Sequence, residues 1–199
     1  MGFLSGNLSL KRFYIEDIGI FKDKDKVLAN MENFCFKDIE DEAAEESIGW
    51  VSPGKIYKTA IEAEEVFFGN YVLLALRYDT KKVSKTLVEF KAEKIIEAEG
   101  LKFTNNRELK RFKDDIKREL LKKSLPTPKV IEAVIDLNKS TLFLNSVSKK
   151  TGALFLSLFE KTFAIMPIYV DNTVFCHIAV GSGGVEKLSS LTETVIYDE

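Results

Sequence analysis

The pattern of apolar residues indicates three strands within the first 80 residues of the chain. Residues 8–15 are predicted to form a strand. The side chains of this strand predicted to face the interior are Leu8, Leu10 and Phe13. Residues 65–68 and 71–78 are β-rich runs separated by Gly69-Asn70, which is a strong signal for a β-hairpin. Residues 49–54 contain two glycines and a proline and are expected to interrupt any regular element.

One short helix and one acidic segment are expected between these strands. Asp23 or Asp25 can cap a helix that runs to Phe34. The apolar stripe of this helix consists of Val27, Leu28 and Met31. The acid-rich residues 38–47 are expected to form a loop or a short helix. An acidic surface segment is the favoured interpretation of this run, and cation binding by its carboxylates is the alternative.

The hydrophobic period becomes helical at Ser84 and remains so until Pro126. Gly100 ends a first helix, and Asn105 or Asn106 can cap a second one. Apolar residues of the second helix recur at spacings of three, four and four, and form one stripe of Leu109, Phe112, Ile116 and Leu120. At about 100° per residue, the basic residues occupy one flank and the back of the helix, and the acidic residues occupy the other flank.

After this helical stretch, the pattern indicates two strands and an apolar helix. Pro126 and Pro128 stop the second helix, and strands follow at about 129–137 and 141–145. Residues 148–163 are predicted to form a helix that is almost fully buried against a sheet. The apolar side chains that crowd this helix are Leu154, Phe155, Leu158, Phe159 and Phe163.

The order of the elements predicts an α+β fold. Strand-like sequence occupies residues 167–180, and a flexible turn is expected at 181–184. We therefore expect an antiparallel or mixed sheet packed with helices, with a projecting charged helical hairpin at about 84–125. Residues 1–199 are expected to form one domain, with 82–128 as a helical sub-domain.

The composition agrees with a packed core in a reducing compartment. The chain has 199 residues, of which 45% are hydrophobic and 15 are phenylalanine, so it can form a core without a disulfide. Cys35 and Cys176 are expected to be buried free thiols, as in cytoplasmic proteins. The first residues lack the pattern of a signal peptide, and no apolar stretch approaches the length of a membrane span. The expected location is the cytoplasm.

The charge of the chain is unevenly distributed. The formal net charge is −2, which by itself gives no indication of a nucleic-acid partner. Residues 102–129, however, hold ten basic and four acidic side chains, so this segment has a net charge of +6 and the remainder has −8. This asymmetry indicates a basic surface presented by an acidic body.

A series of short motifs runs along residues 3–170. In chain order these are Phe3-Leu4, Asn7-Leu8, Arg12, Gly49-Trp50-Val51-Ser52-Pro53, the strand 72–77 ending in Arg77, Leu125-Pro126, Ile135-Asp136, Leu142-Phe143-Leu144, Ser148-Lys149-Lys150, the helix 152–163 and Pro167. A long charged helical stretch precedes Leu125-Pro126. The order and spacing of these motifs resemble those of the RdgC family of recombination-associated proteins.

The resemblance implies a DNA-binding function. RdgC-family proteins are described as ring-shaped homodimers that encircle duplex DNA with little sequence preference and restrain the bacterial recombinase on DNA. The implied location is the nucleoid, the implied partners are double-stranded DNA, a second copy of the chain and the recombinase through competition on DNA, and no cofactor or membrane is implied. The residues expected to contact phosphates are Lys110, Arg111, Lys113, Lys117, Arg118, Lys122, Lys123 and Arg12.

Four other interpretations remain open. The basic helix can be an ordinary solvated face, or its acidic flank can meet a partner's basic flank in a dimer. The family also carries an exonuclease label, and Asp79 with Glu89-Phe90-Lys91 fits the loose spacing of metal-dependent nucleases. Glu89 and Lys91 fall in a helical pattern, however, and point about 200° apart, so we expect no enzyme activity. The chain can also be a recombination-linked interaction module that does not touch DNA.

The remaining chemically active residue types have structural interpretations. His177 is the only histidine, so a zinc site of ordinary spacing is not expected, and its neighbour Cys176 would point to the opposite strand face. Trp50 is expected to anchor its loop in the core rather than to stack on a base. The glycines at 181–184 lack the spacing of a phosphate-binding loop.

Overall fold

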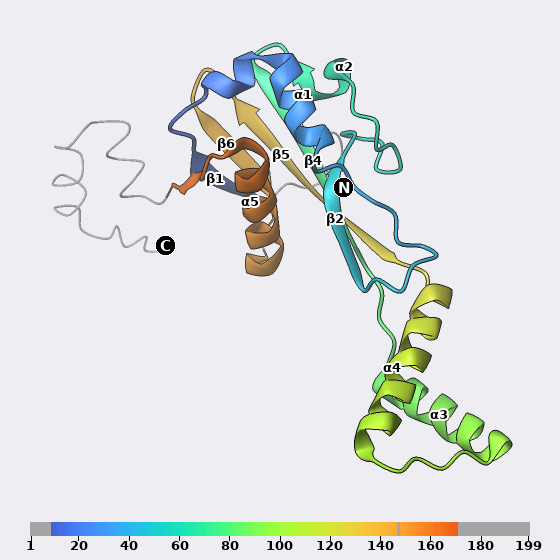
Figure 1. Ribbon diagram of the computed structural model, residues 1–199. Helices are drawn as coiled ribbons and strands as arrows, with labels where there is room; N and C mark the ends of the chain where they lie inside the picture. The colour runs from blue at the N-terminus through green and yellow to red at the C-terminus, as the bar shows by residue number, and fades with distance from the viewer. Residues whose placement is uncertain (1–8, 147, 171–199) are drawn as a thin grey trace, which may run out of the picture.

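The computed structural model describes residues 9–146 and 148–170, which form one antiparallel sheet and its covering helices (Figure 1). The strand order is β2-β4-β5-β6-β1-β7, and β3 pairs with the start of β4. The strands are β1 (Leu10–Tyr14), β2 (Glu46–Val51), β3 (Phe67–Phe68), β4 (Tyr71–Thr80), β5 (Thr127–Asp136), β6 (Thr141–Asn145) and β7 (Ile168–Tyr169). With helices packed on this sheet, the predicted α+β class is confirmed.

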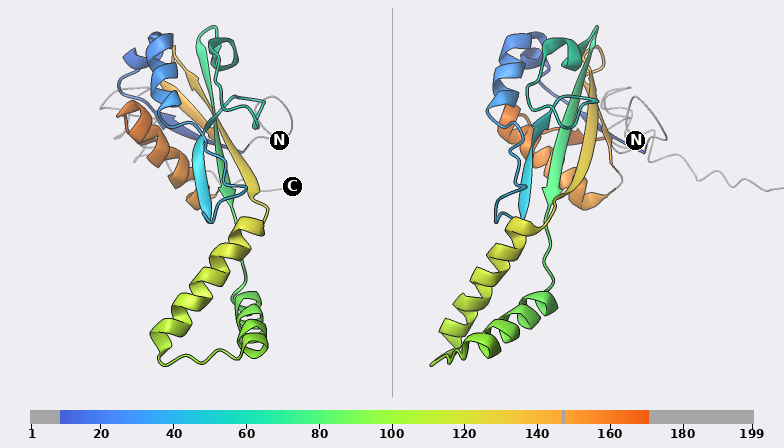
Figure 2. Two further views of the ribbon diagram at one scale, coloured as in Figure 1. Left: turned by 45° about the vertical axis from the view of Figure 1, so that its right-hand side comes forward. Right: turned by 90° about the vertical axis from the view of Figure 1, so that its right-hand side faces the viewer.

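The helices fall into two groups. The first group accompanies the sheet and consists of the 3-10 helix η1 (Gly19–Lys22) and the helices α1 (Lys24–Glu32), α2 (Ala63–Val66) and α5 (Lys149–Phe163). The second group is a separate hairpin of α3 (Lys85–Glu99) and α4 (Asn106–Lys123). Figure 2 shows α1 and α5 on the same face of the sheet. The hairpin extends from the end of the sheet at which β4 stops and its partner β5 begins. We call the sheet with its covering helices the body.

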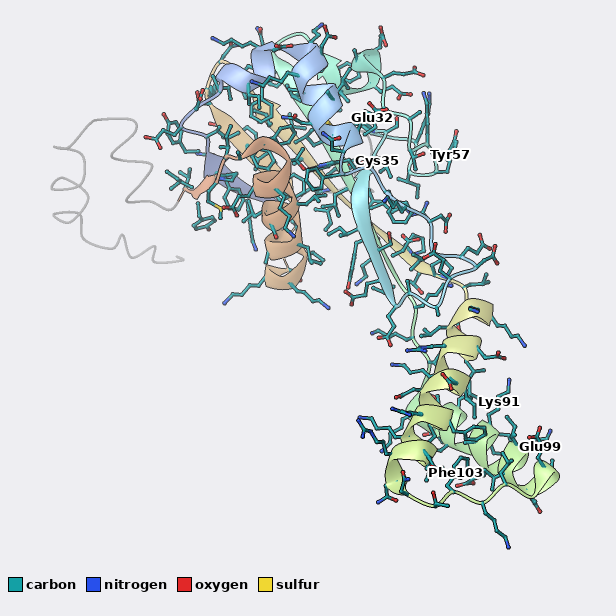
Figure 3. The ribbon with its side chains drawn as sticks, in the orientation of Figure 1. Glu32, Cys35, Tyr57, Lys91, Glu99 and Phe103 are labelled. Atoms are coloured by element: carbon teal, nitrogen blue, oxygen red, sulfur yellow. The ribbon has the colours of Figure 1, made fainter. Side chains whose placement is uncertain are left out.

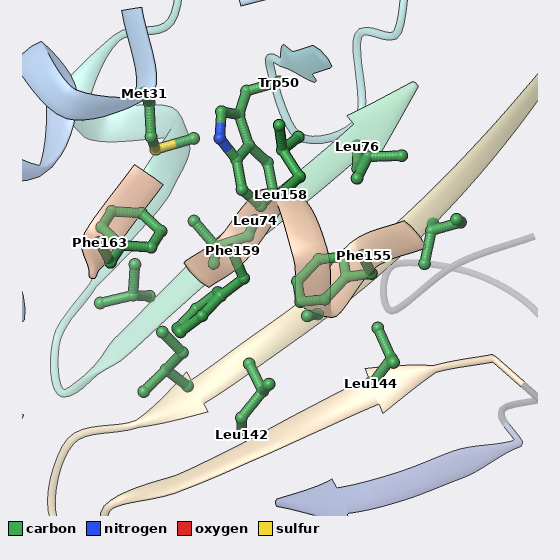
Figure 4. Packing of buried hydrophobic residues seen from close by; sticks show 14 of the residues in the cluster. Met31, Trp50, Leu74, Leu76, Leu142, Leu144, Phe155, Leu158, Phe159 and Phe163 are labelled. Atoms are coloured by element: carbon green, nitrogen blue, oxygen red, sulfur yellow. The ribbon is translucent and has the colours of Figure 1, made fainter. Parts of the chain in front are cut away.

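The core of the body lies between α5 and the sheet (Figure 4). Phe155, Phe159 and Trp50 are fully buried there, and the centres of the Trp50 and Phe155 rings lie 5.6 Å apart with the ring planes nearly perpendicular. The Trp50 indole Nε1 donates a hydrogen bond of 2.8 Å to the hydroxyl of Thr162, which in turn donates to the Leu158 carbonyl. Trp50 therefore anchors its segment in the core, as expected, with its polar atom satisfied.

Helix α5 is buried on one face rather than almost completely. Phe155, Phe159 and Phe163 are at most 4% exposed, but Ser157 and Glu160 on the opposite face are exposed. The apolar residues recur at spacings of four, so they occupy a stripe that a single sheet can cover. The predicted contact with a sheet is confirmed, and the prediction of near-total burial was wrong.

Two sequence predictions for the strands were also wrong. Strand β2 continues through Gly49 and Trp50, where an interruption was expected. A Cβ at Gly49 would lie 2.4 Å from the Phe36 Cα, so glycine allows the segment before β2 to lie against the strand. In β1, Leu10 is 47% exposed while Phe13 is buried, because residues three apart on a strand point to opposite faces.

Other predictions agree closely with the structure. Asp23 caps α1 by accepting a 3.1 Å hydrogen bond from the Lys26 amide. Gly69 has φ 59° in the turn that joins β3 to β4, and this left-handed conformation favours glycine. Cys35 (Figure 3) is a free thiol, as predicted, but the prediction that it is buried was wrong. It is half-buried because it lies in the segment packed beside β2 rather than in the main core.

Several predicted features lie outside the described residues. These are Leu8, Cys176, His177, the strand-like residues 171–180, and the turn at 181–184. Within the described ranges, no helix combines the length and apolar character needed to cross a bilayer.

Candidate nucleic-acid interface

The two helices of the hairpin begin and end at capping residues. The Ser84 hydroxyl accepts a hydrogen bond from the Leu87 amide at the start of α3, and Gly100 ends that helix with φ 64°. Asn105, rather than Asn106, caps α4 by accepting from the Glu108 amide at 2.9 Å. Glu108 in turn accepts from the Thr104 hydroxyl and amide, and these hydrogen bonds lower the pKa of its carboxyl. The local sequence therefore determines both helix boundaries.

The hairpin has a small apolar interior of its own. Val88 and Ala92 of α3 pack against Ile116 of α4, and these three are the buried residues of that cluster. Phe103, in the loop between the helices, places its ring 5.2 Å from that of Phe112 (Figure 3). The half-buried residues around the cluster are Val83, Ile95, Phe112 and Leu120. The hairpin therefore has far less buried apolar surface than the body.

A buried lysine joins the hairpin to the body. Lys81, directly after β4, is 2% exposed, and its Nζ donates to the carbonyls of Glu40, Glu42 and Leu121 at 2.5 to 3.1 Å. The Leu121 carbonyl belongs to the last turn of α4, where a cation is favourable. Lys81 therefore ties the acidic segment and α4 to the same point of the chain. No signal in the sequence distinguished it from its neighbour Lys82.

The predicted phosphate-binding residues of α4 divide into two sets. Lys110, Lys113 and Lys117 line a cleft of about 430 Å³ together with Val83, Lys85, Val88, Glu89 and Asp114. We call this the neck cleft. Arg111, Arg118 and Lys122 do not line it and are exposed. At about 100° per residue these three cluster on the back of α4, which we call the outer basic face.

The ion pairs on α4 differ between the two sets. In the neck cleft, Lys117 contacts the Glu45 carboxylate of the body, which makes it a partnered cation. On the outer basic face, Arg118 and Asp115 lie 3.6 Å apart and are both about 70% exposed, so their pair contributes little. Arg111 and Lys122 form no ion pair with a described residue.

Two further predicted cations lie apart from these sets. Lys123 is the last residue of α4 and is exposed, at a helical position close to the apolar stripe. Arg12 lies on β1, which is separated from β5 by β6, and its guanidinium is 5.9 Å from the centre of the Phe143 ring. The structure therefore does not bring Arg12 together with the cations of the hairpin.

The carboxylates considered for a nuclease site have other partners. Asp79 is fully buried, and its two oxygens accept hydrogen bonds of 2.8 and 2.6 Å from the Arg77 guanidinium. This hydrogen bonding raises the pKa of Arg77. Glu89 lies on α3, where it pairs with Lys85 at 3.6 Å. Among residues 9–146 and 148–170, no three or more histidine, cysteine or acidic side chains cluster in a way that could hold a metal ion.

Comparison with known proteins identifies the family of the chain. No curated protein sequence matches it. The family model described as "Putative exonuclease, RdgC" matches residues 8–174. The match includes both the sheet and the projecting hairpin, and it covers well over half of the chain. The chain therefore belongs to the RdgC family, which is linked to DNA binding and recombination.

Proposed function

We propose that the protein binds duplex DNA without sequence preference and modulates homologous recombination as a ring-like homodimer. The observation that carries this proposal is the charge of the projecting hairpin. Residues 85–123, which contain both helices of the hairpin, hold twelve basic and eight acidic side chains, a net charge of +4 in a chain whose total is −2. A basic element that stands off an acidic body attracts a polyanion to that element rather than to the body.

The outer basic face supplies cations suited to the phosphate backbone. Arg111, Arg118 and Lys122 have long side chains that reach into solvent. A DNA phosphate can replace the weak contact between Arg118 and Asp115 without exposing a buried charge. Neutralised phosphates release counterions, and this release drives binding. Phosphate contacts carry no base information, so we expect little preference among sequences.

An apolar face of α3 supports the proposal of a homodimer. Leu87 and Phe90 are 46% and 65% exposed, and residues three apart share one face of a helix. These two side chains leave apolar surface on one face of α3 that a second copy of the chain could cover. Contact between two copies there would bring two basic helices to one duplex. A protein coating the duplex in this way would compete with the recombinase for DNA.

Fluorescence anisotropy of the full chain with two unrelated duplexes, at several salt concentrations, tests the proposal. We expect log K to fall linearly with log salt, with a slope of about −0.9 for each phosphate contact. The two duplexes should bind with similar affinity. A salt-independent affinity, or no binding at low salt, would contradict the DNA-binding proposal and favour the interaction module.

The same samples, incubated with Mg²⁺ and run on a denaturing gel, test the proposal that the protein is not a nuclease. We expect intact strands, because each carboxylate already has its own cationic partner. Asp79 is buried in its pair with Arg77, and Glu89 pairs with Lys85 on α3. Mg²⁺-dependent shortening of the strands would support the exonuclease alternative instead.

A further inference from the structure

The neck cleft has a concave shape and a lysine-rich lining, which are not needed if the outer basic face binds the phosphate backbone of DNA. It lies between the start of α3 and the middle of α4, with a volume of about 430 Å³. Val83 and Val88 form its apolar wall, and lysines from both helices reach its lining. A second hollow adjoins the neck cleft and shares Val83 and Lys117 with it. Its other lining residues are Glu45, Lys81, Lys82 and Ser84.

The charge of these two hollows favours an anion. Their lining contains six lysines against three carboxylates, but the buried Lys81 ammonium already donates to three carbonyls, which leaves five lysines for a ligand. The lysines are Lys81, Lys82, Lys85, Lys110, Lys113 and Lys117, and the carboxylates are Glu45, Glu89 and Asp114. Lys110 and Lys113 form no ion pair with a described residue. Cations this close together repel one another, so a bound anion would relieve the repulsion.

The contact between Lys117 and Glu45 shows the kind of group that the cleft accepts. The Glu45 carboxylate comes from the acidic segment of the body and already contacts a lysine of α4. Both side chains are about half exposed, so an anion with more charge can displace the carboxylate. The lysines that remain around it would then share the same ligand.

The form of the cleft favours a terminal phosphate over a phosphate within a strand. A phosphate monoester carries a charge of about −1.5 to −2 and three acceptor oxygens, so several lysines can bind it at once. A phosphodiester within a duplex carries one charge. Because it is bonded to a sugar on each side, it can reach the rim of the neck cleft but cannot enter it. The excess of lysines over carboxylates in the cleft matches the more highly charged group.

We propose that the neck cleft binds the terminal phosphate of a DNA strand. This inference rests on the proposed DNA-binding function. The protein would then have two DNA contacts: the outer basic face, which can bind the duplex at any position along the DNA, and the neck cleft, which binds a strand end. The site includes Lys85, which lines the neck cleft, and Lys82, which lines the adjoining hollow. Neither was among the predicted phosphate ligands.

Three DNA substrates of one sequence test the proposal with the full chain. They are a blunt duplex with 5′-phosphates, the same duplex with 5′-hydroxyls, and a closed dumbbell without ends. We expect the phosphorylated duplex to bind about tenfold more tightly than the other two, a typical effect of a charge-assisted hydrogen-bond set. The double variant Lys82→Gln/Lys85→Gln should lose this preference while binding the dumbbell as the parent does.

Lys91→Gln/Lys94→Gln is the matched control, because it removes two lysines from α3 that do not line either hollow. It should keep the preference for the phosphorylated end. Equal affinity of the parent for phosphorylated and hydroxyl ends would overturn the strand-end site while leaving the DNA-binding proposal in place. Failure to bind any of the three substrates would overturn both. Inorganic phosphate should compete for the site and abolish the preference for the phosphorylated end in the parent and in the control variant. It should not change the relative affinities of the Lys82→Gln/Lys85→Gln variant, which has no such preference to lose.

Discussion

Phe159 of α5 and Phe90 of α3 are both helical phenylalanines, but Phe159 is fully buried whereas Phe90 is 65% exposed. The same contrast holds for the two parts of the molecule. In the body, aromatic rings from α5 pack against the sheet and Trp50. In the hairpin, only Val88, Ala92 and Ile116 are buried in the shared cluster. The body therefore provides most of the hydrophobic stabilisation, and the hairpin provides a charged surface.

The contrast extends to how charges are used. In the body, Asp79 and Arg77 satisfy each other at the sheet, and the Arg77 guanidinium also lies 4.3 Å from the centre of the Phe36 ring. On the hairpin, Arg111 and Lys122 are exposed without a described ion-pair partner. Charges that are already satisfied stabilise the fold, whereas unpartnered exposed charges are available to a ligand.

The largest effect is expected in the body. Phe159→Ala should lower the free energy of unfolding by about 3–5 kcal/mol, because it leaves a cavity among rings that cannot all collapse into it. Phe90→Ala is the matched change in the hairpin and should alter the stability of the monomer by less than about 1 kcal/mol. Urea unfolding followed by circular dichroism measures both. Similar losses for the two variants would remove the distinction between a stabilising body and a surface-bearing hairpin.

An intermediate effect, on DNA rather than on stability, is expected at the outer basic face. Replacing Arg111, Arg118 and Lys122 with Gln keeps the helix propensity nearly constant, so each exposed site should change stability by no more than about 0.5 kcal/mol. Affinity for every duplex should fall alike, and the salt slope should become shallower by up to about one for each lost contact. Anisotropy at several salt concentrations measures this. A stable variant that binds as tightly as the parent would move the interface away from this face, with Arg12 as the next candidate.

The smallest effect at neutral pH is expected for Tyr78→Phe. Among the described residues, the buried Tyr78 hydroxyl has no partner within hydrogen-bonding geometry, although the Glu46 carboxylate is close enough to act on it. Burial, reinforced by Glu46, raises the pKa of Tyr78 to about 12. The unfolded chain loses this proton near the ordinary value of 10.0, so the stability linked to neutral Tyr78 is complete below that pH and is lost as the pH rises towards 12.

The variant should therefore match the parent at neutral pH and be the more stable of the two at alkaline pH. Urea unfolding at pH 8 and pH 11 measures the difference, with Tyr57→Phe as the control because Tyr57 is 78% exposed. If the parent and Tyr78→Phe respond to alkali in the same way, the hydroxyl has a partner or access to water.

Much of the fold could be predicted from local patterns. The helix caps at Asp23, Ser84 and Asn105 and the turn at Gly69 depend on side chains that bond or bend their own backbone. The predicted hairpin, its apolar stripe and its charge asymmetry follow from the same kind of local information. Gly49 shows where local patterns fail. This glycine was interpreted as the end of a strand, but it is required because the segment containing Phe36 packs closely against β2.

The candidate site shows the same limit more strongly. The sequence by itself determined which residues of α4 are basic and, through the helical period, on which sides of the helix they lie. Tertiary structure alone decided that Lys113 and Lys117 turn into a cleft with Lys85, and that Lys81 is buried while Lys82 is exposed. These differences depend on contacts between segments far apart in the chain, such as the carbonyls of the acidic segment that hold Lys81. Helical period reports only the direction of a side chain from its own axis, whereas burial and partnership depend on what the rest of the fold brings to meet it.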